Sequence, residues 1–125
     1  MFTWLLFAGL LVGSPNQDLA ECGPSIASRA LLHLCLGERE RIQGEAFPQD
    51  GAERRRRFET AAEHYRQASN LGTSEVKLRA LTLLAHTYDV QHLNDATRRE
   101  TVVRELTENL RRAGGIERLF YAARR

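Results

Sequence analysis

The sequence predicts an all-α fold from its proline positions, its composition and the spacing of its apolar residues. Proline occurs only at positions 15, 24 and 48, so no proline from Gln49 onward forbids long helices. Strong helix formers dominate that stretch, and β-branched residues are sparse. Apolar residues recur in steps of three and four, and no alternating strand pattern competes with them.

The composition is that of one folded domain. The chain has 125 residues, of which 42% are hydrophobic and 27% charged. The formal net charge is only +2, which gives little steering toward nucleic acid. Arginine supplies nearly all of the positive charge, since Lys77 is the only lysine.

An apolar N-terminal segment, residues 1–21, precedes the expected helical domain of residues 22–125. Its run from Phe2 to Gly13 has the length of a signal-peptide core and is too short to span a bilayer. We therefore expect a cleaved export signal and a periplasmic or secreted protein. Because no basic residue precedes the run and the cleavage site is poor, a membrane-surface anchor and a buried N-terminal helix remain as alternatives.

The two cysteines, Cys22 and Cys35, are compatible with export. A helix from Ser25 to Cys35 rises about 15 Å, and the three residues back to Cys22 return about 10 Å at most. A disulfide needs Cα atoms within about 7 Å, which the Gly23-Pro24 turn just allows. A buried Cys35 and an exposed Cys22 fit the sequence at least as well.

The first helix is expected from Ser25 to about Gln43, with Gly44 at its end and Pro48 preventing its return. Its apolar stripe consists of Ile26, Ala30, Leu34 and either Leu31 or Cys35. A loop over residues 44–51 follows.

The second helix has the clearest signals. Asp50 is its expected N-cap, Glu53 follows in capping-box spacing, and Gly72 is its expected C-cap. One inward face is expected from Phe58, Ala61, Ala62, Tyr65, Ala68 and Leu71.

Two more helices and a partial one follow. The third begins at Thr73 or Ser74 and is expected to bury Leu78, Leu81, Leu84, Ala85 and Tyr88. Asn94 is the expected cap of the fourth, whose stripe is Val102, Val103, Leu106 and Leu110. After two glycines, residues 116–125 begin a helical pattern again. Short turns make neighbouring helices antiparallel.

The second helix resembles that of a tetratricopeptide repeat (TPR). That family alternates aromatic residues and alanines in steps of three, four and three, which Phe58, Ala61, Tyr65 and Ala68 match. The alanines let a paired helix approach closely, and the aromatics fill the remaining space. Thr73 stands where the family usually has proline.

The resemblance extends over residues 27–112 as about two degenerate repeats. Leu36-Gly37 occupies the Leu-Gly pair of the preceding helix and Gly44 its turn, although the loop to Phe58 is longer than the family's. The third helix matches the first-helix pattern at Leu81, Leu84, Ala85 and Tyr88, with Ala85 in place of glycine. Residues 116–125 resemble the opening of an incomplete repeat.

The resemblance implies antiparallel helix pairs stacked as a short right-handed superhelix. Repeat packing would then depend on Phe58, Ala61, Tyr65, Ala68, Leu84, Ala85 and Tyr88. A concave groove would be lined on the third helix by Arg79, Thr82, His86 and Asp89. Since repeats cannot bury their apolar faces alone, we expect the last one to be covered by a partner, by self-association or by further residues of a longer protein.

No pattern predicts a catalytic, cofactor or metal site. The four histidines, at positions 33, 64, 86 and 92, lack metal-ligand spacing with one another or with cysteine. The sequence has no CxxC pair, no glycine-rich phosphate loop and no GxSxG. Most glutamates have an arginine at pairing distance, so we expect no acid/base pair and no enzyme.

The run Arg54–Arg57 is the strongest electrostatic feature. Contact with phosphate or an acidic partner is one interpretation, because positive charge is mildly unfavourable at a helix start. A solvated helix start is the preferred one, because four consecutive residues point around the whole helix.

We therefore expect an exported, non-enzymatic TPR-like scaffold that binds a protein or peptide. One alternative is an accessory domain that has lost an enzymatic neighbour. Another is a basic helical protein that contacts nucleic acid or anionic membrane through Arg54–Arg57. The small net charge disfavours nucleic acid, and membrane contact is expected only through the N-terminal segment.

Overall fold

The computed structural model describes residues 22–23, 26, 28–49 and 51–114 and confirms the all-α class. These residues contain no strand and form four helices: α3 (Arg29–Glu45), α4 (Ala52–Leu71), α5 (Ser74–Thr87) and α6 (Ala96–Arg112). The predicted N-terminal segment and the partial helix at 116–125 lie outside the described residues.

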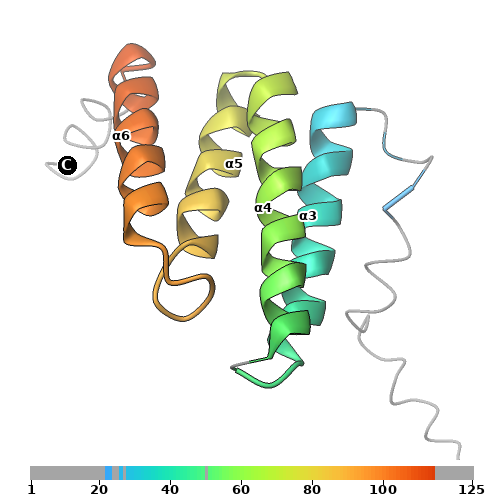
Figure 1. Cartoon of the computed structure of the whole chain (residues 1–125). Helices are drawn as coiled ribbons and strands as arrows, with labels where there is room; N and C mark the ends of the chain where they lie inside the picture. The colour runs from blue at the N-terminus through green and yellow to red at the C-terminus, as the bar shows by residue number, and fades with distance from the viewer. Residues whose placement is uncertain (1–21, 24–25, 27, 50, 115–125) are drawn as a thin grey trace, which may run out of the picture.

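The four helices run alternately up and down, as the short connections require (Figure 1). Each helix packs on the next one along the chain, and α3 also contacts α5. Side-chain ion pairs join α4 to α6, with Arg66 3.0 Å from Glu105 and Arg98 2.8 Å from Glu59. None of the described helices is both long and apolar enough to cross a membrane.

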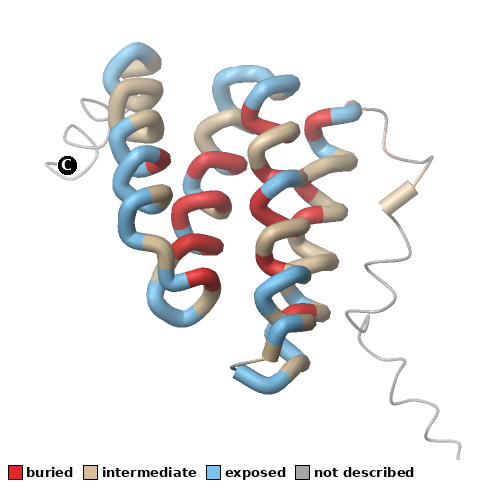
Figure 2. The backbone as a smooth tube through the Cα atoms, in the orientation of Figure 1, coloured by how far each residue is buried: buried red, intermediate tan, exposed pale blue. Residues whose placement is uncertain are grey.

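The core lies on the facing sides of the helices, which Figure 2 shows in red. The structure buries all seven residues that the sequence assigns to packing: Phe58, Ala61, Tyr65, Ala68, Leu84, Ala85 and Tyr88. Ala62 and Leu81 are also buried, as expected, but Leu71 is 48% exposed because it is the last residue of α4. The α4 stripe was therefore predicted correctly except at its end.

The outer helices follow their predicted stripes less closely. On α6 only Val102 is buried, whereas Val103 is 37% exposed and Leu106 packs against the edge of the core. On α3, Leu34 is buried and Leu31 is 41% exposed. On α3 the burial of Ala30 and Leu34 agrees with the predicted stripe, and the exposure of Leu31 leaves Cys35 as its further member. On α6 the predicted stripe was too wide, because the backbone of this helix packs closely only on α5 among the described helices, and a helix with one neighbour buries a narrower face.

Several helix ends differ from the prediction. The predicted start of α3 at Ser25 lies outside the described residues, and the hydroxyl of Ser28 caps the helix by accepting the N–H of Leu31 at 3.3 Å. Asp95, and not Asn94, caps α6 by accepting the N–H of Arg98 at 3.0 Å. Asn94 instead has φ +52°, a left-handed turn conformation that asparagine tolerates better than most residues.

The start of α4 is not the predicted capping box. Asp50 lies outside the described residues, and Gly51 occupies the N-cap position without a side-chain hydrogen bond. Glu53 pairs with Arg56 and Arg57 of its own helix. The first turn is thus stabilised by ion pairs between neighbouring turns.

Two glycines of α3 let α4 approach closely. Gly44, predicted to end the helix, lies inside it, and a Cβ there would be 2.9 Å from the Phe58 ring. A Cβ at Gly37 would be 2.6 Å from the ring of Tyr65, whose hydroxyl donates to Glu38 at 2.9 Å. Both glycines are therefore packing residues, and α3 ends one residue after Gly44, at Glu45.

Replacing Gly37 by alanine is expected to destabilise the protein by about 1 kcal/mol. In an exposed helix the same change stabilises by about 1 kcal/mol, but overpacking a core costs about 1–3 kcal/mol. The Tyr65 ring is fully buried and cannot move aside freely. Urea unfolding followed by circular dichroism measures the difference. In a Tyr65→Leu background Gly37→Ala should no longer destabilise, and equal effects in both backgrounds would contradict the contact.

A disulfide links Cys22 to Cys35, with the Cα atoms 5.7 Å apart. The sequence was compatible either with this bridge or with a buried Cys35 and an exposed Cys22, and the structure has the bridge. It fastens the chain before α3 to the second turn of that helix.

Candidate binding face between α3 and α5

A hollow of about 180 Å³ lies between α3 and α5. We call it the α3–α5 hollow; its lining consists of Leu31, Leu34, Cys35, Glu38, Arg79 and Leu83. Leu31 and Leu83 offer apolar surface, since Leu31 is 41% exposed and Leu83 is only partly buried against the core. The hollow therefore combines an apolar floor with charged groups at its edge.

The two charged groups of the α3–α5 hollow differ in their partners. Glu38 accepts hydrogen bonds from Arg41 at 2.7 Å and from the Tyr65 hydroxyl at 2.9 Å. Burial is the main cause that raises the pKa of Tyr65, and the neighbouring Glu38 adds to it. Arg79 is exposed and makes no hydrogen bond or ion pair with the described residues. Arg79 therefore contributes an exposed positive charge to the edge of the hollow.

A larger hollow, of about 580 Å³, lies where the end of α3 meets the α5–α6 loop. We call it the loop hollow; it is lined by Glu45, Phe47, Gln49, Arg54, His86, Gln91 and His92. Its lining is mostly polar, in contrast to that of the α3–α5 hollow.

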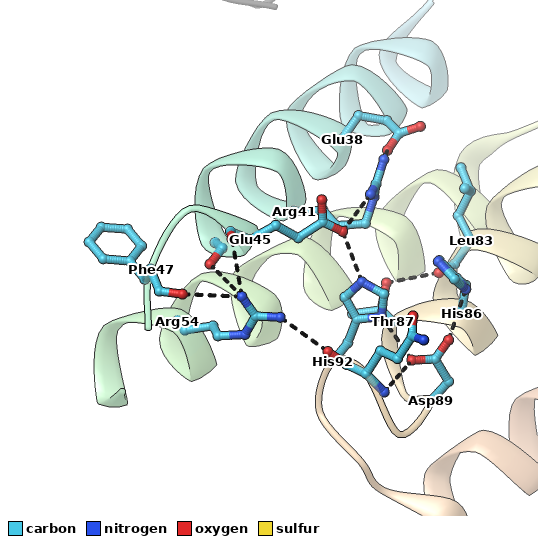
Figure 3. Close-up of polar contacts among 12 residues, drawn as sticks. Glu38, Arg41, Glu45, Phe47, Arg54, Leu83, His86, Thr87, Asp89 and His92 are labelled. Carbon is cyan, nitrogen blue, oxygen red and sulfur yellow. Dashed lines mark hydrogen bonds and ion pairs between the residues drawn. The ribbon is translucent and has the colours of Figure 1, made fainter. Parts of the chain in front are cut away.

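Three side chains at the loop hollow form a histidine–carboxylate cluster: His86, Asp89 and His92 (Figure 3). Nδ1 of His86 is 2.9 Å from one oxygen of Asp89, and Nδ1 of His92 is 2.8 Å from the other. The remaining ring nitrogen of His92, Nε2, is 2.9 Å from Glu45 on α3. His86 belongs to the last turn of α5, whereas Asp89 and His92 belong to the loop that follows.

The electrostatics of this cluster favour ionised carboxylates. Burial opposes the ionisation of Glu45, but hydrogen bonds from His92 and Arg41 outweigh it, so the pKa of Glu45 lies below its ordinary value. Burial likewise opposes the ionisation of Asp89, but His92 and the Gln91 N–H outweigh it and lower its pKa.

The four groove residues predicted from the sequence do not share one site. Arg79 lines the α3–α5 hollow and His86 the loop hollow. Asp89 lies beside His86 in the histidine–carboxylate cluster. Thr82 is exposed, its hydroxyl donates to the Leu78 carbonyl at 2.8 Å, and it lines neither hollow.

Sequence spacing also missed the cluster itself. The prediction of no metal-ligand spacing considered pairs of histidines and cysteines, whereas the donor atoms of His86, Asp89 and His92 lie within 4.8 Å of one another. The sequence signal that could have revealed the cluster is Asp89, which lies midway between two histidines that are six residues apart.

The arginine run Arg54–Arg57 is occupied by contacts within the chain. Arg54 donates to the carbonyls of Glu45, Phe47 and Gln91, each at 3.2 Å, and so caps the end of α3. Arg55 donates to the Leu93 carbonyl at 3.4 Å, Arg56 pairs with Glu53, and Arg57 pairs with Glu53 and Glu40. Arg54 and Arg57 are thus engaged within the fold, whereas Arg55 and Arg56 remain exposed.

The other two histidines form a second pair, between α3 and α4. Nδ1 of His33 lies 3.0 Å from Nδ1 of His64. Burial and the neighbouring His33 lower the pKa of His64. One ring must therefore be neutral to accept this hydrogen bond.

No protein-family model, curated protein or solved structure matches the chain.

Proposed function

We propose that this protein is a non-enzymatic, TPR-like module that binds a peptide or protein segment along α3 and α5. The observation that carries the proposal is the α3–α5 hollow, where the apolar surface of Leu31 lies beside Arg79, which is exposed and has no ion-pair partner among the described residues. A peptide in which an apolar side chain is followed by a carboxylate would complement this surface.

A TPR-like arrangement is supported by the way the helices pair. α3 and α5 contact each other directly, whereas α4 and α6 are joined by long arginine side chains. First helices that lie closer together than second helices give a stack that curves toward the first helices. The close approach of the Tyr65 ring to Gly37 further supports the assignment of Leu36-Gly37 as the Leu-Gly pair of a repeat.

An oxidising compartment is supported by the Cys22–Cys35 disulfide. Disulfides persist in exported proteins and are rare in the cytosol. Together with the apolar N-terminal segment, this favours a periplasmic or secreted location. Self-association through the end of the helix stack stays a prediction.

The alternative of a nucleic-acid or membrane contact through Arg54–Arg57 is less well supported. Phosphate binding needs guanidinium groups that are free to approach the ligand. Here Arg54 caps α3, and Arg56 and Arg57 pair with glutamates, which favours the scaffold over the phosphate-binding alternative.

Replacing Leu31 by aspartate is expected to weaken peptide binding by at least tenfold. The change places a charge on the apolar floor of the α3–α5 hollow, which is worth about 1.4 kcal/mol or more of binding free energy. Peptides would first be selected against the wild-type protein from a random displayed library. Their affinities for wild type and variant would then be compared by fluorescence anisotropy.

The matched control is Val103→Asp on α6, since Val103 is 37% exposed and Leu31 is 41% exposed. This control should bind the selected peptides as wild type does. Circular dichroism should show both variants folded, because both positions are exposed. A library without enriched peptides, or equal weakening by the two variants, would contradict the proposal.

A further inference from the structure

We propose that His86, Asp89 and His92 form a binding site for a divalent transition-metal ion of the zinc type. The three side chains offer two imidazole nitrogens and one carboxylate oxygen, a donor set that zinc prefers. This inference does not depend on the proposed peptide binding.

The spacing of the donors suits one ion. Zinc binds imidazole nitrogen at about 2.0–2.1 Å and carboxylate oxygen at about 2.0–2.2 Å, which places tetrahedral ligand atoms roughly 3.3 Å apart. Both histidines already contact Asp89, with N–O distances of 2.9 and 2.8 Å, and all donor atoms lie within 4.8 Å. Small side-chain rotations would therefore let both ring nitrogens and the carboxylate, which already point toward one another in Figure 3, bind one ion.

The surrounding chain holds these ligands in place. The N–H of Gln91 donates to Asp89 at 2.9 Å, which fixes the carboxylate within the loop. Glu45 accepts from Nε2 of His92 at 2.9 Å and leaves Nδ1 directed at the site. Arg41 in turn holds Glu45 at 2.8 Å. A carboxylate behind a ligating histidine is the usual second layer of a metal site.

The site is closed on one side and open on the other. The His92 side chain is 4% exposed, whereas that of His86 is 49% exposed and lines the loop hollow. Three protein ligands leave a fourth position for water or for a donor from another molecule. The negative charges of Asp89 and Glu45 favour a cation there, although Arg41 pairs with Glu45 and Arg54 lies at the same hollow.

The second histidine pair supplies an internal control. His33 and His64 also meet, but among the described residues no third metal-binding side chain lies within the same reach of them. Two imidazoles alone form a weaker site than two imidazoles and a carboxylate. The His33→Ala/His64→Ala variant should therefore keep the proposed site intact.

The test is titration of the metal-free full chain, without an affinity tag, with ZnCl₂ in a calorimeter and with CoCl₂ in a spectrophotometer. We expect wild type and the His33→Ala/His64→Ala variant to bind one ion per chain, with visible cobalt bands. His86→Ala and Asp89→Asn should bind at least tenfold more weakly. His86 is half-exposed, so its variant should stay folded, which circular dichroism checks.

A thermal-shift measurement adds an independent reading. Zinc should raise the melting temperature of wild type and should leave that of His86→Ala unchanged, because only a ligand of the native state stabilises it. The proposal is overturned if wild type binds no zinc or if His86→Ala binds as tightly as wild type. Loss of binding in the His33→Ala/His64→Ala variant alone would overturn it as well.

Discussion

Replacing Phe58 by alanine is expected to lower the free energy of unfolding by about 3–5 kcal/mol. The Phe58 side chain is fully buried and joins three parts of the fold. It packs on Gly44 of α3, where an added Cβ would be only 2.9 Å away. The ring of His92 lies edge-on to it at 4.9 Å between centroids, and the guanidinium of Arg54 lies 4.8 Å from its centre.

The loss is large because Gly44, His92 and Arg54 all contact the same Phe58 ring. Alanine would leave a cavity between α3, α4 and the α5–α6 loop, and the cation–π contact with Arg54 would disappear. Unfolding in urea, monitored by circular dichroism, measures the change in free energy.

Phe47→Ala is the matched control for this prediction. Phe47 lies in the loop after α3, is only half-buried, and has the guanidinium of Arg57 5.9 Å from its ring centre. Phe47→Ala should lower the free energy of unfolding clearly less than Phe58→Ala does. Equal losses would show that the junction around Phe58 does not hold the helices together.

The helices could be predicted from the sequence because their signals are local. The α4 face from Phe58 to Ala68 needs only the helical period and the alternation of small and large residues. The errors fall where tertiary packing decides. Leu71 and Val103 have the right spacing, but in the structure they are 48% and 37% exposed. The sequence suggests that Gly44 ends the helix, whereas the structure shows that Gly44 makes room for the Phe58 ring.

The candidate sites depend on contacts between distant residues, so the sequence could give only their parts. His92 and Glu45 are 47 positions apart, and nothing in their local sequence indicates that they meet. Arg54 was interpreted by its charge, whereas its partners are backbone carbonyls, which every residue has. Arg79 was predicted as a groove residue from its place on the third helix alone, whereas the apolar surface beside it comes from Leu31 on α3.

Breaking the Cys22–Cys35 disulfide is expected to lower the free energy of unfolding by about 3 kcal/mol. The bridge closes a loop with a sequence separation of 13 residues. In the chain-entropy model a loop of about this length contributes about 3 kcal/mol, because the cross-link restricts the unfolded chain. Urea unfolding of the wild type with and without a thiol reductant measures the effect.

Cys22→Ala and Cys35→Ala separate the cross-link from the packing of the thiols. Cys35 lines the α3–α5 hollow, so its loss also removes a few contacts there. Cys22→Ala leaves those contacts in place. Both variants should lose about the same stability, and neither should respond to the reductant. A wild type whose unfolding ignores the reductant would contradict the prediction. If the prediction holds, a reducing compartment would weaken the anchoring of α3, which carries Leu31. Folding in an oxidising compartment would therefore favour the state that can bind a peptide.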